Sequence, residues 1–223
     1  ALNEKGKPDA AIASYKQAIK IKPNYADAYN NMGNALKEKG ELDAAIDSFK
    51  QALKIKPNYA DAHYNMGIAL NEKGKPDGAI DSYKQAIKIK PDYADAYNNM
   101  GIALKEKGEL DAAIDSYKRA LKINPDYANA HNNIGVALLD KDDFDGAIDS
   151  YKRALKINPD YVDTHNNIGV ALLDKDDFDG AIDSFKRVLK INPDYVKAHS
   201  NMGVALQAKG EPYAAIDSFK RAL

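Results

Sequence analysis

The 223-residue sequence contains no cysteine, so neither a disulfide framework nor a thiolate zinc site can form. It also lacks an excess of charge of either sign, with 32 basic residues against 33 acidic residues. Near neutrality argues against a non-specific nucleic-acid binder, which normally has a net basic surface. The longest apolar stretches, such as 134–139, are far too short to span a bilayer. We therefore expect neither a nucleic acid nor a membrane as a partner.

A secretory signal is also missing, and the chain starts at Ala1, without methionine and within a repeat. We interpret it as a piece of a longer protein. The absence of cysteine leaves the redox state of its compartment open. Among the possible compartments we favour the cytoplasm.

Proline, in contrast, recurs every 34 residues, and each of these prolines is followed two residues later by a tyrosine. The prolines are Pro23, Pro57, Pro91, Pro125, Pro159 and Pro193. A fixed period of this length is typical of an array in which each repeat buries its apolar face against its neighbours. We predict one array over 1–223, and such arrays generally bind rather than catalyse. Its full repeats are 26–59, 60–93, 94–127, 128–161 and 162–195, flanked by partial repeats 1–25 and 196–223.

Each repeat is predicted to form two antiparallel helices. In 26–59, apolar residues follow helical spacing up to Gly40, which ends the first helix. The second helix begins at about Asp43 and ends before Pro57. Stacking such pairs predicts an all-α, right-handed superhelical solenoid.

A glycine inside the first helix needs an explanation, because glycine there costs about 1 kcal/mol relative to alanine. Gly33 recurs once per repeat, always with an alanine twelve residues later, Ala45 in this case. We interpret the pair as two small residues that face each other and let the paired helices approach closely.

This pattern resembles the tetratricopeptide repeat (TPR). The matching residues in 26–59 are Tyr29, Met32, Gly33, Leu36, Ala45, Phe49, Ala52 and Pro57. The resemblance covers the whole chain and implies that first helices line a concave groove, with second helices on the convex side. Repeats that read like 94–101 are also similar to the superhelical TPR arm of O-linked N-acetylglucosamine transferases.

The first-helix face opposite the core has an asparagine at one position in every repeat where that helix is present. We call this column the asparagine ladder: Asn31, Asn65, Asn99, Asn133, Asn167 and Asn201. The resemblance to the transferase arm implies that these amides bind the main chain of an extended peptide. The alternative is that they bridge neighbouring repeats.

Two more columns share that face. An aliphatic column consists of Ile68, Ile102, Val136, Val170 and Val204. It indicates a surface covered by a partner, unless curvature of the superhelix already half-buries it. An acidic column includes Asp27, Asp61, Asp95 and Asp163. Acidic potential favours a basic or neutral peptide over the acidic tails of chaperones.

No catalytic or metal site is expected. The histidines His63, His131, His165 and His199 occupy the aromatic core position on different helices, which predicts packing rather than metal ligation. The serines of the second helices have no histidine base nearby. Segments 140–146 and 174–180 resemble a calcium loop only faintly, because Phe144 occupies a required ligand position. We expect an aspartate-rich turn there, and neither a cofactor nor enzyme activity.

The predicted function is a protein–protein interaction scaffold that binds an extended peptide or partner protein in the concave groove. Two alternatives are a substrate-recruiting arm of a larger transferase and a self-assembling structural spacer. No capping helix is evident at either end of the sequence, so we also expect end-to-end self-association through the terminal repeats.

Overall fold

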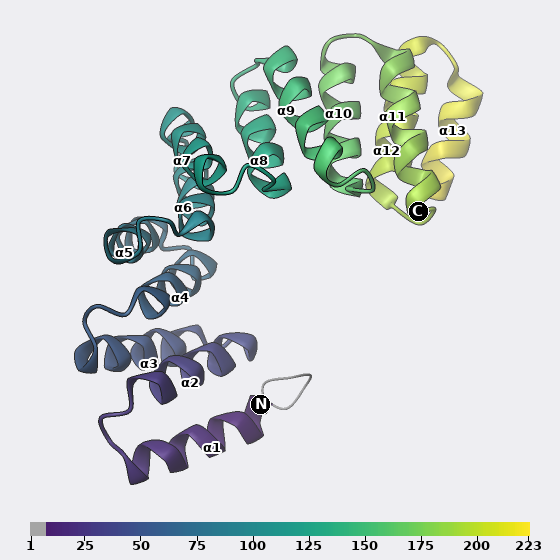
Figure 1. The fold of residues 1–223 in the computed structure, drawn as a ribbon. Helices are drawn as coiled ribbons and strands as arrows, with labels where there is room; N and C mark the ends of the chain where they lie inside the picture. The colour runs from purple at the N-terminus through teal and green to yellow at the C-terminus, as the bar shows by residue number, and fades with distance from the viewer. Residues whose placement is uncertain (1–7) are drawn as a thin grey trace. The chain divides into compact units, whose positions relative to one another are not determined.

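The structure, a computed structural model, describes residues 8–223, and over that range it contains thirteen α-helices and no strand. Figure 1 shows them as successive helix pairs. The helices of the first four repeats are α1 (Pro8–Ile21), α2 (Ala26–Glu38), α3 (Leu42–Ile55), α4 (Ala60–Glu72), α5 (Pro76–Ile89), α6 (Ala94–Glu106) and α7 (Leu110–Ile123). The others are α8 (Ala128–Leu139), α9 (Phe144–Ile157), α10 (Val162–Asp174), α11 (Phe178–Ile191), α12 (Val196–Lys209) and α13 (Pro212–Arg221). The predicted all-α repeat architecture is confirmed.

The helices form two compact units, divided between Ile123 and Asn124. Within each unit every helix packs against the next one along the chain. First helices of consecutive repeats also touch each other, α2 with α4 and α4 with α6 in one unit, and α8 with α10 and α10 with α12 in the other. Within each unit, as far as residues 8–223 describe it, no second helix contacts the second helix of a neighbouring repeat. The first helices therefore lie on the inner side of each unit.

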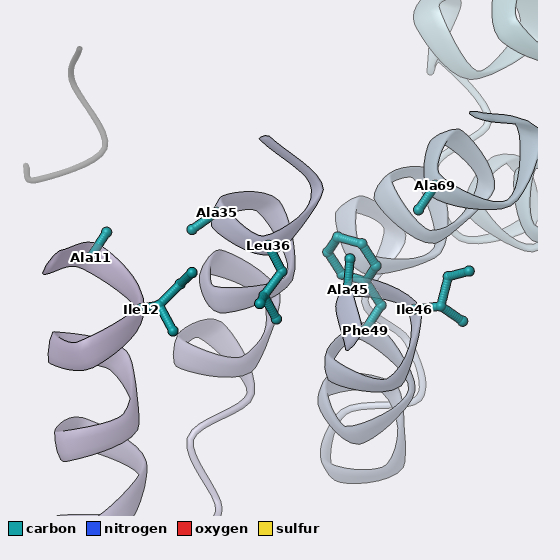
Figure 2. Packing of buried hydrophobic residues seen from close by; sticks show 8 residues of the cluster. All are labelled: Ala11, Ile12, Ala35, Leu36, Ala45, Ile46, Phe49 and Ala69. Carbon is teal, nitrogen blue, oxygen red and sulfur yellow. The ribbon is translucent and has the colours of Figure 1, made fainter. Parts of the chain in front are cut away.

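The core lies between these helices, as Figure 2 shows for the first unit. Ile12, Leu36 and Ile46 are each at most 7% exposed, and Phe49 is fully buried. Leu70 and Met66 of the following repeat pack against the same cluster. Burying one such large side chain contributes about 1.5–3 kcal/mol, so packing against neighbouring repeats adds to the packing within each repeat.

The glycine that recurs once per repeat, Gly33 in 26–59, has a different cause from the one predicted. A Cβ atom at Gly33 would lie 2.5 Å from Phe49 Cε1, and its three nearest atoms would all belong to that ring. The prediction that the glycine faces Ala45 is therefore wrong in its partner: the glycine makes room for the ring sixteen residues later. The same holds for Gly67 and Tyr83, Gly101 and Tyr117, Gly135 and Tyr151, Gly169 and Phe185, and Gly203 and Phe219.

The turn between the two helices of a repeat needs a left-handed residue. Gly40 has this role, as predicted, with φ of 77°. Asp142 and Asp176 take the same position in two later repeats, both with φ of 60°. The Asp143 carboxylate then accepts a hydrogen bond from the Gly146 N–H at 3.0 Å and caps α9. The segment 140–146 is thus a turn followed by a helix cap.

The last helix exposes apolar residues that its counterparts bury. Ile216 in α13 is 49% exposed, whereas Ile182, one repeat earlier, is 5% exposed. Met202 and Leu206 of α12 pack in the cluster that contains Ile182. Tyr213 and Leu223 are exposed as well. Self-association through this surface stays a prediction.

Candidate functional site

The ladder asparagines lie on the first helices and are half-buried, except for the exposed Asn31. Several of them donate a side-chain N–H to the preceding repeat. These bonds join Asn65 to Asn30 at 3.1 Å, Asn167 to Asn132 at 3.3 Å, and Asn201 to Asn166 at 3.2 Å. Each of these three amides therefore uses one of its N–H donors to bridge neighbouring repeats, as the alternative interpretation predicts. An amide has two N–H donors and a carbonyl oxygen, so bridging leaves capacity for a ligand.

Sequence reasoning missed a second asparagine column, one residue before the ladder. Its members are Asn30, Asn98, Asn132 and Asn166, and all are at most 7% exposed. Three of them are the acceptors of the bridging bonds just described. The signal was available, because paired asparagines recur at this place in four repeats.

Repeat 60–93 departs from this pattern, because Tyr64 replaces the buried asparagine. Its hydroxyl accepts a hydrogen bond from Asn99 Nδ2 at 3.0 Å. The Tyr64 ring also contacts Tyr93 and Tyr83, with ring centroids 4.8 and 6.0 Å apart. Burial, together with the nearby Asp95 carboxylate, raises the pKa of Tyr64. At this step the ladder residue Asn99 therefore bonds to a tyrosine of an aromatic cluster instead of to an asparagine.

The acidic column has an internal partner in the tyrosine that follows each repeat's proline. Tyr93 donates to Asp61 at 3.1 Å, and Tyr195 donates to Asp163 at 2.6 Å. Burial and the hydrogen bond to Asp163 raise the pKa of Tyr195 to about 12. A similar bond to Asp27 contributes, after burial, to the raised pKa of Tyr59. These bonds therefore tie the first helix of each of these repeats to the turn that ends the same repeat.

The aliphatic column is half-buried at Ile68, Ile102, Val136 and Val170, and 45% exposed at Val204. In the first unit it borders a cavity of about 150 Å³ between α4 and α6. Its lining consists of Ile68, Asn71, Glu72, Tyr83, Asn99 and Ile102. The structure therefore brings together three residues of the predicted site, Ile68, Asn99 and Ile102. Asn71 and Tyr83 are additions to that site.

A column of ion pairs between repeats was also missed. A lysine after each first helix reaches the first aspartate of the preceding second helix, as Lys107 does with Asp77 at 2.7 Å. The equivalent pairs are Lys39–Asp9, Lys73–Asp43, Lys175–Asp145 and Lys209–Asp179. The carboxylates are about 80% exposed, so each pair contributes little to stability.

The histidines lie where the sequence places them, on the aromatic position of four first helices. His165 and His199 are buried, and their Nε2 atoms lie 2.8 Å from the carbonyl oxygens of Pro159 and Pro193. His63 makes the same contact with Pro57 at 3.1 Å. Each ring therefore joins the start of its helix to the preceding proline turn.

Among residues 8–223, no group of three or more histidine, aspartate or glutamate side chains could hold a metal ion. Serines of the second helices donate to backbone carbonyls, as Ser48 does to Ala44 at 2.9 Å. No described helix is both long enough and apolar enough to cross a membrane.

Comparisons with known proteins agree with this geometry. The TPR repeat profile matches residues 1–40, 33–74, 69–108, 101–142, 137–176 and 171–210. No curated protein matches the chain.

Several solved structures have the same fold. MamA is 29% identical, with a TM-score of 0.64, over 70% of this chain and 92% of that chain. YrrB, described as a TPR protein with an unusual peptide-binding site, is 23% identical, with a TM-score of 0.66, over 88% of this chain and 97% of that chain. Cut9, solved with Hcn1, is 20% identical, with a TM-score of 0.80, over all of this chain and 44% of that chain. The chain therefore belongs to the tetratricopeptide repeat family and is a protein–protein interaction scaffold.

Proposed function

We propose that the first-helix face of this protein binds an extended segment of a partner protein. The observation that carries the proposal is the cavity between α4 and α6, in which Asn99 lies beside Ile68 and Ile102. An amide next to aliphatic side chains suits a peptide, because main-chain hydrogen bonds and apolar contacts can form together. YrrB has a peptide-binding site according to its description, but at 23% identity that likeness extends to the fold alone.

The ladder supports the proposal in both units. Asn65 and Asn201 each use one N–H to bridge repeats, which fixes the orientation of the amide before a ligand arrives. A preorganised donor loses less entropy on binding than a free one. Each net hydrogen bond to a peptide contributes about 0.5–1.5 kcal/mol, so several in register give useful affinity with little dependence on sequence.

The charge of this face defines the preferred ligand. Asp27, Asp61 and Asp163 are exposed carboxylates, although tyrosine hydroxyls at the ends of the same repeats contact them. Complementary potential speeds capture of a basic segment and weakens with salt. We therefore expect a basic or neutral segment, bound less tightly as the salt concentration rises.

The test is binding of an array of ten-residue peptides, with hits measured by fluorescence anisotropy. Ile68→Ser with Ile102→Ser should weaken binding about tenfold, because apolar contact in the cavity is lost. The matched control is Ile21→Ser with Ile123→Ser, since both isoleucines are exposed and lie at the ends of second helices. Equal losses in the two double variants, or an array without any hit, would contradict the proposal.

A further inference from the structure

An ion pair joins the first helices α2 and α4 near their C-terminal ends. Lys37 Nζ of α2 lies 3.9 Å from Glu72 Oε1 of α4. The Lys37 side chain is 23% exposed, so it is held against the inner side of the first unit. The pair places a lysine ammonium next to the carboxylate of Glu72, the last residue of α4.

The next step along the same unit lacks this lysine. Asn71 occupies the position of Lys37, and its Nδ2 donates to Glu106 Oε1 at 3.2 Å. A neutral amide satisfies one lone pair of the carboxylate but leaves its negative charge uncompensated. Within the described residues Glu106 forms no ion pair with a cation. The carboxylate therefore has the acceptor capacity for an ammonium that the chain itself does not supply.

Besides the Glu106 carboxylate, the side-chain oxygen of Asn71 is an unused acceptor. Its Oδ1 atom is buried and has no hydrogen-bond partner among residues 8–223. Buried polar groups in proteins are nearly always hydrogen-bonded, so an orphan acceptor calls for an explanation. A donor entering the adjacent cavity would give this oxygen a partner after a small rotation of the amide.

The cavity next to these acceptors has room for one side chain. Its volume is about 150 Å³, and a cavity of that size can hold a benzene-sized group. Ile68 and Ile102 provide apolar walls, and Glu72, the partner of Lys37, is the carboxylate in the lining. Glu106 lies beside this lining, where it accepts the hydrogen bond from Asn71. Tyr83 lines the cavity as a neutral phenol, because burial raises its pKa with help from Glu106 and Glu72. The cavity therefore combines aliphatic walls with a negatively charged, acceptor-rich end.

We propose that this cavity binds a lysine side chain of the extended segment, in the place that Lys37 has one repeat earlier. The inference rests on the proposed function, because it names the residue type that the first-helix face selects. The four-carbon stem would contact Ile68 and Ile102, and the ammonium would donate to Glu106 and Asn71. Lysine fits better than arginine because the chain itself uses a compact ammonium at the equivalent position, and lysine presents a point charge on an apolar stem.

The probe is n-butylammonium, which reproduces the lysine stem and charge without a peptide backbone. Its binding is followed through the δ1 methyl signals of Ile68 and Ile102 in a carbon–proton NMR titration. We expect saturable shifts with a Kd on the order of millimolar, as befits so small a ligand. The neutral analogue n-butanol should bind at least about tenfold more weakly, because it lacks the charge-assisted hydrogen bonds.

Two variants test the assignment. Asn71→Lys introduces the lysine that α2 has at the equivalent position, so the chain's own ammonium should occupy the site and reduce n-butylammonium binding at least about tenfold. Glu106→Gln should reduce it similarly by removing the charge. Asp115→Asn is the matched charge control, since Asp115 is exposed on α7, and it should bind like the parent protein. Urea unfolding midpoints establish that each variant is folded.

Equal shifts with n-butanol, or unchanged binding in both Asn71→Lys and Glu106→Gln, would overturn the lysine assignment. Failure of the proposed function is distinguishable from failure of this inference. If peptides bind but do not prefer lysine over norleucine, the inference is wrong and the peptide groove stands. If n-butylammonium binds as expected and no peptide does, the cation site stands and the peptide groove is wrong.

Discussion

The second unit joins its repeats by uniform amide pairs, whereas the first unit replaces one such pair. Asn132 with Asn167, and Asn166 with Asn201, form the same bond in successive repeats. Repeats 128–161 and 162–195 differ at only five positions, which explains that uniformity. In the first unit Tyr64 occupies the position of the buried asparagine. Asn71 occupies the position that Lys37 has one repeat earlier.

The difference separates the requirements of stacking from those of selectivity. Residues that recur at every step, such as the glycine and the aromatic ring that it accommodates, fix the spacing of the helices. A residue that departs from its column changes one step and leaves the others intact, because each repeat contacts only its neighbours. The cavity of the first unit lies at the step where two departures, Tyr64 and Asn71, occur in the same helix.

The largest effect is expected where the shared spacing itself is broken. Gly67→Ala would place a Cβ atom 2.5 Å from Tyr83 Cε1, so the unfolding free energy should fall by about 3 kcal/mol. Gly78→Ala in the same repeat is the control, because its Cβ atom would lie 3.5 Å from Leu70 Cδ1. That variant should be stabilised by up to about 1 kcal/mol through helix propensity. Urea unfolding measures both, and equal effects would contradict the role of the ring.

A smaller effect is expected from removing an amide acceptor in the second unit. Asn132→Ala would leave two donors without their partner, since Asn167 and the buried Thr164 both donate to Asn132 Oδ1. We expect a loss of about 2 kcal/mol in unfolding free energy. Asn166→Ala removes the acceptor to which Asn201 donates and should cost about 1 kcal/mol. If both variants unfold like the parent protein in urea, the amide pairs do not stabilise the stack.

Tyr64→Asn tests the comparison between the two units by introducing an amide where the first unit has a tyrosine. It restores the amide of the other repeats and should leave the unfolding free energy within about 1 kcal/mol of the parent value, because contacts with Tyr83 and Tyr93 are exchanged for an amide pair. The measurement is again urea unfolding. A loss above about 3 kcal/mol would show that the aromatic cluster is essential to this step.

The helix pairs could be predicted from the sequence because their signals are local. The period set by Pro57 and the left-handed Gly40 mark where a helix ends without reference to any neighbour. The ladder column followed from the same helical spacing. The partner of Gly33 could not be derived in this way, since a helical wheel gives the face of a residue but not the ring that reaches it.

The site was predictable only in part for the same reason. Ile68, Asn99 and Ile102 share a face and could be grouped from spacing alone. The replacement of lysine by Asn71 gains meaning only once α2, α4 and α6 are known to lie side by side. Likewise, the acceptor role of Asn30 depends on the angle between neighbouring helices, which no single repeat contains.

A further prediction compares the inter-helix turns of the two units. Gly108 is left-handed with φ of 78°, whereas Asp142 adopts φ of 60° in the equivalent turn. A left-handed residue with a Cβ atom costs about 1 kcal/mol, although aspartate tolerates it better than most. Asp142→Gly should therefore raise the unfolding free energy by up to about 1 kcal/mol, measured in urea. Gly108→Asp should lower it by a similar amount, and a change of the same sign in both would contradict this account.

The smallest effect concerns acid stability and His131, which occupies the position of Tyr97 in the preceding repeat. Burial lowers the pKa of His131, and Arg153 adds to this, against the raising influence of the Pro125 carbonyl and Asp149. Below about pH 6.5, the usual pKa of histidine, the unfolded chain binds a proton that the folded chain takes up less readily. The stability contributed by the neutral ring is thus complete above that pH and is lost as the pH falls through the lowered folded-state pKa. His131→Tyr should reduce the loss of unfolding free energy between pH 7.5 and 5.5, and an identical loss in both proteins would show that another group controls it.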